Sequence, residues 1–256
     1  MHRIERLNII SDYISRNGKA EVAQLSEIVN VSEATIRRDL AFLASQKKIV
    51  RSHGGAALNE NLLMDETPFA LRSAHNVEQK KQIARAALPL IQSGRTYFFD
   101  CSSTVYELAK LITDQKIVAV TDTMYTAIEL NRKEDVSVII LGGTVSKSTG
   151  SSAGPFALSM LNTLQPSIAF IGLPSIMEDG SFSVAGMHDY EIKTALLKQA
   201  ETVVVLIDSS KYRSKRCFLK IGDLSEVDTV ITDSAVDPSF QALCDSFNCK
   251  LLIANP

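Results

Sequence analysis

The sequence lacks the features that would place the protein in a membrane or an oxidising compartment. Its four cysteines form no CxxC pair and no cluster with histidine, so neither a disulfide framework nor a zinc site is expected. No apolar run approaches the ~18 residues that a membrane span requires. The first ten residues alternate charged and apolar side chains, unlike the continuous hydrophobic region of a signal peptide. We therefore expect a cytoplasmic protein with no metal and no cofactor.

The net charge is also small, but it is unevenly distributed. The 256 residues carry a formal charge of −2, whereas residues 1–57 hold nine Lys and Arg against six Asp and Glu. Because residues 1–57 are slightly basic and the rest of the chain is acidic, the phosphates of nucleic acid are attracted to the amino-terminal part. Because the excess is small, non-specific DNA binding should be weak for a monomer and should need the doubled contacts of a dimer.

Residues 31–40 read VSEATIRRDL and predict a DNA-recognition helix. Ser32 can cap the helix by accepting a hydrogen bond from a backbone N–H two or three residues on. Ile36, Leu40 and Leu43 recur at helical spacing, so they form one buried stripe. The remaining face is therefore free to meet another molecule.

The exposed face combines small, hydroxyl and guanidinium groups. Ala34 and Arg38 fall opposite the buried stripe, with Thr35 and Arg37 beside it. In a major groove, Arg can donate two hydrogen bonds to one guanine, and Thr can hydrogen bond to a base or a phosphate. For a lone helix, an ordinary amphipathic helix with solvated arginines would be the better interpretation.

The flanking residues favour DNA recognition. Apolar spacing predicts a first helix over about 4–14 and a short second helix over 22–29, which gives a helix-turn-helix at about 20–39. Residues 47–51 are strand-like, a turn follows, and residues 56–58 can return as a second strand. This pair of strands forms a wing in which Arg51 and His53 can touch phosphate or the minor groove.

Two motifs resemble one known family. TIRRDL at 35–40 and RSHGGA at 51–56 are similar, at the expected separation, to the winged helix-turn-helix of the DeoR family of bacterial transcriptional regulators. The helix geometry and the resemblance together imply a DNA-binding domain at 1–58 and a linker at 59–67. The implied DNA-binding residues are Ser32, Glu33, Ala34, Thr35, Arg37, Arg38, Arg51 and His53.

From residue 68 the pattern changes to alternating strands and helices. Strands are predicted at 96–99, 117–120, 136–141, 168–171, 203–207, 230–231 and 251–253. Helices are predicted at 77–91, 104–112, 123–130, 155–164, 189–200 and 238–247, with Pro89 kinking or shortening the first. This alternation predicts a doubly wound, mainly parallel α/β domain over 68–256.

The carboxyl ends of the predicted strands are polar and mark a candidate ligand site. Residues 102–104 open a helix and offer N–H groups and hydroxyls to an anion. Gly142 and Gly143 allow close approach of the backbone, Lys211 adds a positive charge, and the carboxylates of Asp100 and Asp208 can accept from sugar hydroxyls. Each motif alone could equally be a helix cap. Together they favour a small, polyhydroxylated, anionic ligand.

The family resemblance implies the same class of ligand. DeoR regulators carry a sensor domain resembling ribose-phosphate isomerases and respond to phosphorylated sugars or related metabolites. Ser102 departs from the family pattern by replacing a glycine, and Asp122 by replacing an asparagine; Asp122 should repel a phosphate unless a cation such as Lys211 pairs with it. The implied effector-binding residues are Asp100, Ser102, Ser103, Thr104, Thr121, Asp122, Gly142, Gly143, Gly172, Glu191, Asp208 and Lys211.

The sequence therefore predicts a sequence-specific transcriptional regulator, a repressor of a carbohydrate-utilisation operon, and not an enzyme. It should bind double-stranded operator DNA as a dimer or tetramer and release it when a phosphorylated sugar binds. The first alternative is a sugar-phosphate isomerase with an appended DNA-binding module, whose acid and base would come from Asp100, Asp122, His188, Glu191 and Lys211. The second is a DNA-binding adaptor with a vestigial pocket.

Overall fold

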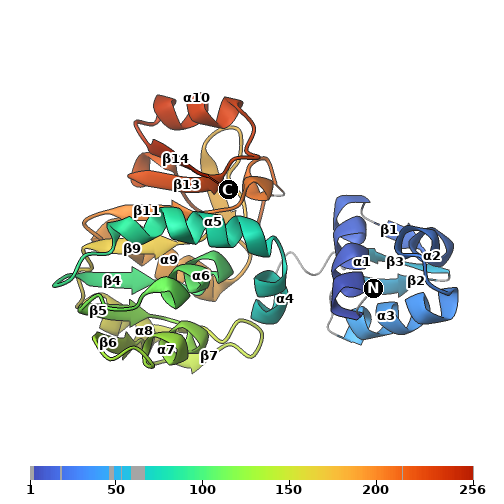
Figure 1. The fold of residues 1–256 in the computed structure, drawn as a ribbon, viewed down its shortest axis with the longest axis horizontal. Coiled ribbons are helices and arrows are strands. Elements are labelled where there is room, and N and C mark those ends of the chain that lie inside the picture. Colours follow the sequence, from blue (N-terminus) through green and yellow to red (C-terminus); the bar gives the residue numbers. More distant parts are fainter. Residues whose placement is uncertain are drawn as a thin grey trace. The chain divides into compact units, whose positions relative to one another are not determined.

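The computed structural model describes residues 3–17, 19–45, 49–52, 54–58, 67–214 and 216–255. Contacts divide the chain into two units, Met1–Thr67 and Pro68–Pro256 (Figure 1). Among the described residues, no helix combines the length and the apolar character needed to cross a bilayer.

The amino-terminal unit is a winged helix-turn-helix, as the sequence predicts. Its elements are α1 (Arg3–Asn17), β1 (Lys19–Glu21), α2 (Val22–Val29), α3 (Glu33–Ser45), β2 (Ile49–Ser52) and β3 (Gly55–Leu58). The predicted wing strands correspond to β2 and β3, which pair antiparallel. β1 was not predicted; it pairs with the other side of β3 and makes the sheet three-stranded.

Helical periodicity explains the core of this unit. Ile10 and Ile14 of α1, Leu25 of α2, and Ile36 and Leu40 of α3 are buried in one cluster. The turn between α2 and α3 is made by Asn30, whose φ of 51° lies in the left-handed region that asparagine tolerates. The predicted apolar stripes are therefore the surfaces that hold the three helices together.

The carboxy-terminal unit is built on a seven-stranded parallel sheet. Its strands, in the order in which they lie side by side, are β14 (Lys250–Ala254), β13 (Thr229–Asp233), β11 (Val203–Leu206), β9 (Ile168–Ile171), β4 (Thr96–Phe99), β5 (Ile117–Thr121) and β6 (Val136–Ile140). All seven predicted strands are confirmed, and every pairing in this sheet is parallel. Two small antiparallel pairs were not predicted: β7 (Thr144–Val145) with β8 (Ser152–Ala153), and β10 (Ser181–Val184) with β12 (Leu219–Asp223).

Helices follow the strands, as the doubly wound prediction requires. They are α4 (Phe69–Ala74), α5 (Val77–Ala87), α6 (Ser103–Leu111), α7 (Met124–Leu130), α8 (Pro155–Leu161), α9 (Met187–Gln199) and α10 (Ser239–Ser246). The six predicted helices are confirmed, and α4 is an addition. Pro89 lies in a 3₁₀ turn, Leu88–Leu90, that ends α5 early, as predicted.

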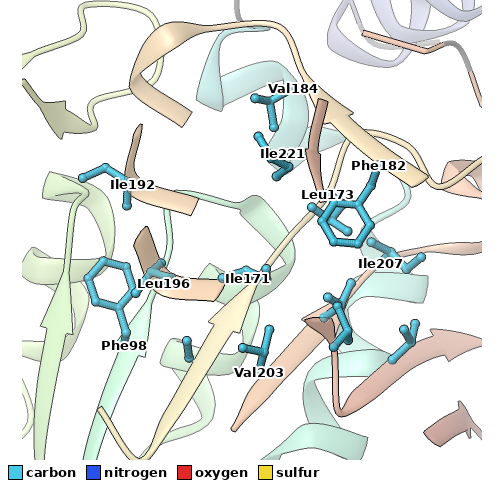
Figure 2. Packing of buried hydrophobic residues seen from close by; sticks show 14 of the residues in the cluster. Phe98, Ile171, Leu173, Phe182, Val184, Ile192, Leu196, Val203, Ile207 and Ile221 are labelled. Carbon is cyan, nitrogen blue, oxygen red and sulfur yellow. The ribbon is translucent and has the colours of Figure 1, made fainter. Parts of the chain in front are cut away.

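The alternating side chains of the strands build a core on each face of the sheet. On one face, Phe99 and Phe170 pack with Ile83 of α5 and Leu108 of α6. On the other face, Phe98, Ile171 and Val203 pack with Ile192 and Leu196 of α9 and with the β10–β12 pair (Figure 2). The central strands are thus buried on both sides, whereas Ile140 of β6 and Ile253 of β14, the two edge strands, are exposed.

The strand order has one switch point, between β4 and β9. From β4 the chain builds outward through β5 and β6, then returns to place β9, β11, β13 and β14 on the other side. The loops after β4 and β9 consequently leave the sheet toward opposite sides, and in open α/β sheets ligands bind beyond the carboxyl ends of the strands at such a point. We refer to the carboxyl ends of β4 and β9, with the loops that follow them, as the switch-point crevice. Asp100 follows β4 and Gly172 follows β9, so both lie at this crevice.

Candidate functional site

The start of α3 is capped as predicted. The Ser32 hydroxyl accepts a hydrogen bond from the Thr35 N–H at 3.3 Å, and the two hydroxyl oxygens lie 3.0 Å apart. The Ser32 carbonyl accepts from the Ile36 N–H at 3.1 Å. These bonds satisfy amide groups that would otherwise be orphans in the first turn. The cap also fixes the position of Thr35 on the surface of the helix.

The face of α3 opposite the core is open to solvent. Glu33, Ala34, Arg37 and Arg38 are exposed and Thr35 is half-buried. The Arg37 guanidinium lies 2.8 Å from the Glu33 carboxylate, one helical turn earlier. The structure therefore presents the small, hydroxyl and guanidinium groups together on one face.

Asp39 is a structural residue of this helix that sequence reasoning did not single out. Its carboxylate is buried and accepts from the Arg6 Nε at 2.5 Å and from the Arg6 Nη2 at 3.3 Å. Arg3 Nε lies 3.6 Å away, on the same turn of α1. The ion pair joins α1 to α3 and so fixes the orientation of the exposed face of α3. The TIRRDL motif thus combines exposed residues with a buried anchor.

The wing places Arg51 on the exposed part of β2, and His53 lies outside the described residues. Two glycines have specific roles here: Gly54 lies in the turn between β2 and β3, and Gly55 is the first residue of β3. Gly54 has a φ of +89°, which the turn requires. A Cβ on Gly55 would lie 2.3 Å from the carbonyl oxygen of Ala20, because β1 approaches β3 there. The RSHGGA motif therefore needs Gly55 so that the third strand can pair.

In the larger unit, Asp100 is the centre of the switch-point crevice. Its Oδ1 accepts from the Ser102 N–H at 2.8 Å, and its Oδ2 accepts from the Gly172 N–H at 2.8 Å. Lys193 of α9 donates to Oδ2 as well, and both side chains are almost fully buried. This carboxylate ties together the two strands that flank the switch point. Lys193 was not predicted as a site residue.

Gly172 and Ser102 are packed against each other across the crevice. A Cβ on Gly172 would lie 2.3 Å from the Ser102 Cβ and 2.4 Å from its hydroxyl oxygen. The Ser102 hydroxyl accepts from the Val105 N–H at 3.1 Å and so caps α6. The side chain that departs from the family glycine is thus accommodated because residue 172 has no side chain.

Carboxylates crowd the same crevice. Asp122, which follows β5, is buried, and burial together with the charge of Asp100 raises its pKa well above the usual value. Asp189 of α9 accepts from the Cys101 thiol at 3.1 Å and lies 3.9 Å from Lys193. Burial opposes the charge of Lys193, but Asp100 and Asp189 outweigh it and raise the pKa of Lys193. The cation beside Asp122 is therefore Lys193, whereas the sequence suggested Lys211.

A second polar cluster lies after β11. The Asp208 carboxylate accepts from the Asn76 side-chain amide at 2.9 Å and from the Ser210 N–H at 3.1 Å. Burial opposes its ionisation, but Lys211, Ser210 and Asn76 together lower the pKa of Asp208. Lys80 of α5 is buried nearby and donates to the carbonyls of Arg72 and His75, and burial lowers the pKa of Lys80 to about 8. Asn76 and Lys80 were not predicted as site residues.

The other predicted effector residues have varied environments. Ser103 and Thr104 are buried in the first turn of α6, and Gly142 and Gly143 are exposed. The buried Thr121 hydroxyl donates to the Phe99 carbonyl at 2.7 Å. Glu191 is half-buried on α9 and stands about 200° around the helix axis from Asp189, which faces the crevice.

Helix α4 covers part of this edge. Phe69 stacks on Tyr125 of α7 with ring centroids 4.0 Å apart and meets Tyr106 of α6 edge-on at 5.3 Å. Its N–H also donates to the Ser148 carbonyl at 2.9 Å, in the loop between β7 and β8. The first helix after residues 59–66 is thus packed on α6, which begins with Ser103 and Thr104, and on α7, which follows Asp122.

The fold and the two sites define a class of protein: a DNA-binding transcriptional regulator with a winged helix-turn-helix and a separate sensor domain. Family models match both units. The DeoR-like helix-turn-helix domain matches residues 6–61, and the DeoR C-terminal sensor domain matches residues 75–234. The chain belongs to the DeoR family of transcriptional regulators.

Characterised relatives are similar over almost their whole length. The glycerol-3-phosphate regulon repressor of Escherichia coli strain K12 is 32% identical, over 91% of this chain and 92% of the relative. The transcriptional repressor GlcR of Bacillus subtilis is 30% identical, over 99% and 97%. The L-fucose operon activator of Haemophilus influenzae is 29% identical, over 97% and 99%. A solved ribose 5-phosphate isomerase from Methanocaldococcus jannaschii covers 55% of this chain and 56% of its own, at 17% identity and a TM-score of 0.41.

Proposed function

We propose that this regulator represses a carbohydrate-utilisation operon and that a phosphorylated sugar binds in the crevice of its sensor domain. The observation that carries the proposal is a pair of polar clusters that follow neighbouring strands of the sheet. Asp100, Asp122 and Lys193 form the cluster at the switch point, and Asp208 with Lys80 and Lys211 forms the cluster after β11. Carboxyl groups suit sugar hydroxyls, and cations with the first turn of α6 suit an anionic group.

The names of the relatives support the same class of effector. They include regulators of a glycerol-3-phosphate regulon and of fucose operons, whose substrates are polyols, sugars or their phosphates. The predicted DNA-binding residues remain our proposal for the operator contacts: Ser32, Glu33, Ala34, Thr35, Arg37 and Arg38 at the start of α3, with Arg51 and His53 of the wing. The predicted effector residues remain our proposal for the ligand site, joined by Asn76, Lys80 and Lys193.

The hydrogen bonds of Asp100 argue against its use as the general base of an isomerase. A general base must be free to take a proton from the substrate. The Asp100 carboxylate is instead occupied by two backbone N–H groups and Lys193, and that lysine is buried against it. We therefore propose a binding site without turnover. Conversion of ribose 5-phosphate or fructose 6-phosphate by the purified full chain would contradict this.

We further propose that the chain acts as a dimer or tetramer in the cytoplasm. The effector then changes the distance between the α3 helices of two protomers. Such a change requires that the effector bind one state more tightly than the other. Helix α4 offers a route for this coupling, because Phe69 packs on α6 and α7 and follows directly after the residues that connect to the DNA-binding unit.

The proposal is tested by measuring operator binding in the presence of candidate effectors. The full chain is titrated onto fluorescent DNA from its own promoter region at fixed salt, because phosphate contacts depend on salt. Glycerol 3-phosphate, glucose 6-phosphate, fructose 1-phosphate and the corresponding unphosphorylated compounds are then added. We expect at least one phosphorylated compound to release the DNA and its unphosphorylated counterpart to have no effect. Release by none of the phosphorylated compounds would contradict the effector class.

A further inference from the structure

Asp122 is held at the crevice by its backbone, whereas one oxygen of its side chain is left without a partner. Its carbonyl accepts from the Ser152 N–H at 2.6 Å and from the Ser152 hydroxyl at 3.2 Å, which fixes the loop after β5 against β8. Asp122 as a whole residue is 97% buried, and within the described part of the chain Oδ1 has no hydrogen-bond partner. A buried polar atom without a partner costs free energy unless something else satisfies it.

The groups that face Asp122 give it no cation of its own. From the end of β4 they are Asp100 and Cys101, and from α9 they are Asp189 and Lys193. Lys193 is the cation that acts on Asp122, but it is already bonded to Asp100 and lies 3.9 Å from Asp189. Arg72 of α4 acts on the neighbouring Cys101. The buried carboxyl groups of Asp100 and Asp122 therefore share the one buried ammonium of Lys193.

The protonation state of the Asp122 carboxyl group follows from the charges around it. If Asp100 and Asp122 were both ionised against the one buried ammonium, a negative charge would be left unpaired, and burying an unpaired charge is very costly. Protonating one carboxyl group is the cheaper solution. Three donors bind the Asp100 carboxylate and none binds Oδ1 of Asp122, so the proton resides on Asp122, where burial raises the pKa. A neutral carboxyl group has one donor and one acceptor oxygen, as an asparagine side chain has a donor and an acceptor.

We propose that Asp122 determines specificity in the effector site: as a neutral carboxyl group it hydrogen bonds to an uncharged hydroxyl or carbonyl oxygen of the effector, and the anionic end of the effector lies away from it. The inference rests on the proposed function for the existence of the effector. The state of Asp122 itself does not depend on that function. Raising the pH ionises Asp122 and weakens effector binding, so the regulator holds its operator more firmly in alkaline conditions.

The first arm of the test needs no ligand. Unfolding of the full chain by urea is measured from pH 5 to 9 for the wild type, for Asp122→Asn, and for Thr126→Val. Thr126 is a matched control, because its hydroxyl is also buried without a partner in the described part of the chain and carries no titratable proton. A proton bound only in the folded state makes the unfolding constant of the wild type rise about tenfold per pH unit relative to Asp122→Asn, up to the folded pKa. The unfolding constant of Thr126→Val should change with pH in the same way as that of the wild type. Parallel curves for the wild type and Asp122→Asn would show that Asp122 is ionised and overturn the proposal.

The second arm uses the phosphorylated compounds named above as probes, with affinity measured by calorimetry. For a compound that binds, Asp122→Asn should keep the affinity within about threefold at pH 7, whereas Asp122→Leu should lose tenfold or more, about one hydrogen bond. Affinity should fall at high pH for the wild type and not for Asp122→Asn. Loss of binding in Asp122→Asn, or an equal pH dependence in both proteins, would overturn the proposal. If no compound binds, the proposed effector class is wrong, while the ligand-free arm still decides the state of Asp122.

Discussion

Replacing Asp39 by alanine should selectively weaken the DNA-binding unit. The Asp39 side chain is 3% exposed and its partner Arg6 is 12% exposed, so the mutation leaves a largely buried guanidinium without its carboxylate. Breaking a buried ion pair in this way costs about 3–5 kcal/mol. The remaining exposure of Arg6 favours the lower end of that range. We therefore expect the free energy of unfolding of this unit to fall by about 3 kcal/mol.

That loss is large for a unit of this size. A domain of roughly 55 residues has a stability of about 3–8 kcal/mol, so the variant would be partly unfolded near physiological temperature. The sensor unit should be unaffected, because the ion pair joins α1 to α3 within the other unit. Hydrogen exchange followed by mass spectrometry on the full chain separates the two effects. Protection of peptides from α1 and α3 should fall about a hundredfold, and protection of the parallel sheet should be unchanged.

Two controls make the prediction specific. Arg6→Met combined with Asp39→Leu replaces the pair with apolar side chains and should recover most of the lost stability. Glu33→Ala breaks the exposed pair with Arg37 and should cost less than about 0.5 kcal/mol. A cost below about 1 kcal/mol for Asp39→Ala, with Arg6 still packed in place, would refute the role assigned to this ion pair.

Three further results are expected. Arg38→Ala should weaken operator binding by about 1–3 kcal/mol at fixed salt, measured by fluorescence anisotropy, and an unchanged affinity would remove Arg38 from the reading residues. Gly172→Ala should cost about 1–3 kcal/mol in urea unfolding because its Cβ would meet Ser102, and adding Ser102→Gly should restore the stability; no rescue would show that the clash is elsewhere. Lys80 has a folded pKa of about 8 against its usual 10.5, so the unfolded chain binds more protons between these values and stability should rise with pH by up to about 1.4 kcal/mol per unit. Lys80→Met should abolish that rise, and equal slopes in the two proteins would contradict it.

The sequence predicts the elements whose side chains repeat regularly. Seven parallel strands and six helices were found from apolar runs and helical spacing, and α3 was found from its cap and stripe. Helix α4 was missed because six residues, FALRSA, are too short to show a period. β1 was missed because its three residues, KAE, carry no strand signal, and its pairing depends on Gly55, which lies more than thirty residues later.

The site was predictable where its residues follow strands and not where they come from helices. Asp100, Asp122 and Asp208 could be chosen because the carboxyl ends of parallel strands meet at one edge. Asp189 and Lys193 reach that edge from α9, and their distance to Asp100 depends on how the helix packs on β8 and β12. A helical spacing of four between an acid and a base was the available signal, but it is common on solvated helices.

The most direct test is selection of DNA from a random pool by the full chain. The wild type should enrich one sequence made of two related half-sites, as expected for an oligomer that presents two α3 helices to DNA. A variant with Thr35→Ala and Arg38→Ala, in which the cap and the buried stripe of α3 are intact, should lose that enrichment while keeping its folded sensor domain. Enrichment of the same sequence with the same affinity by this variant would contradict the assignment of α3 as the reading helix.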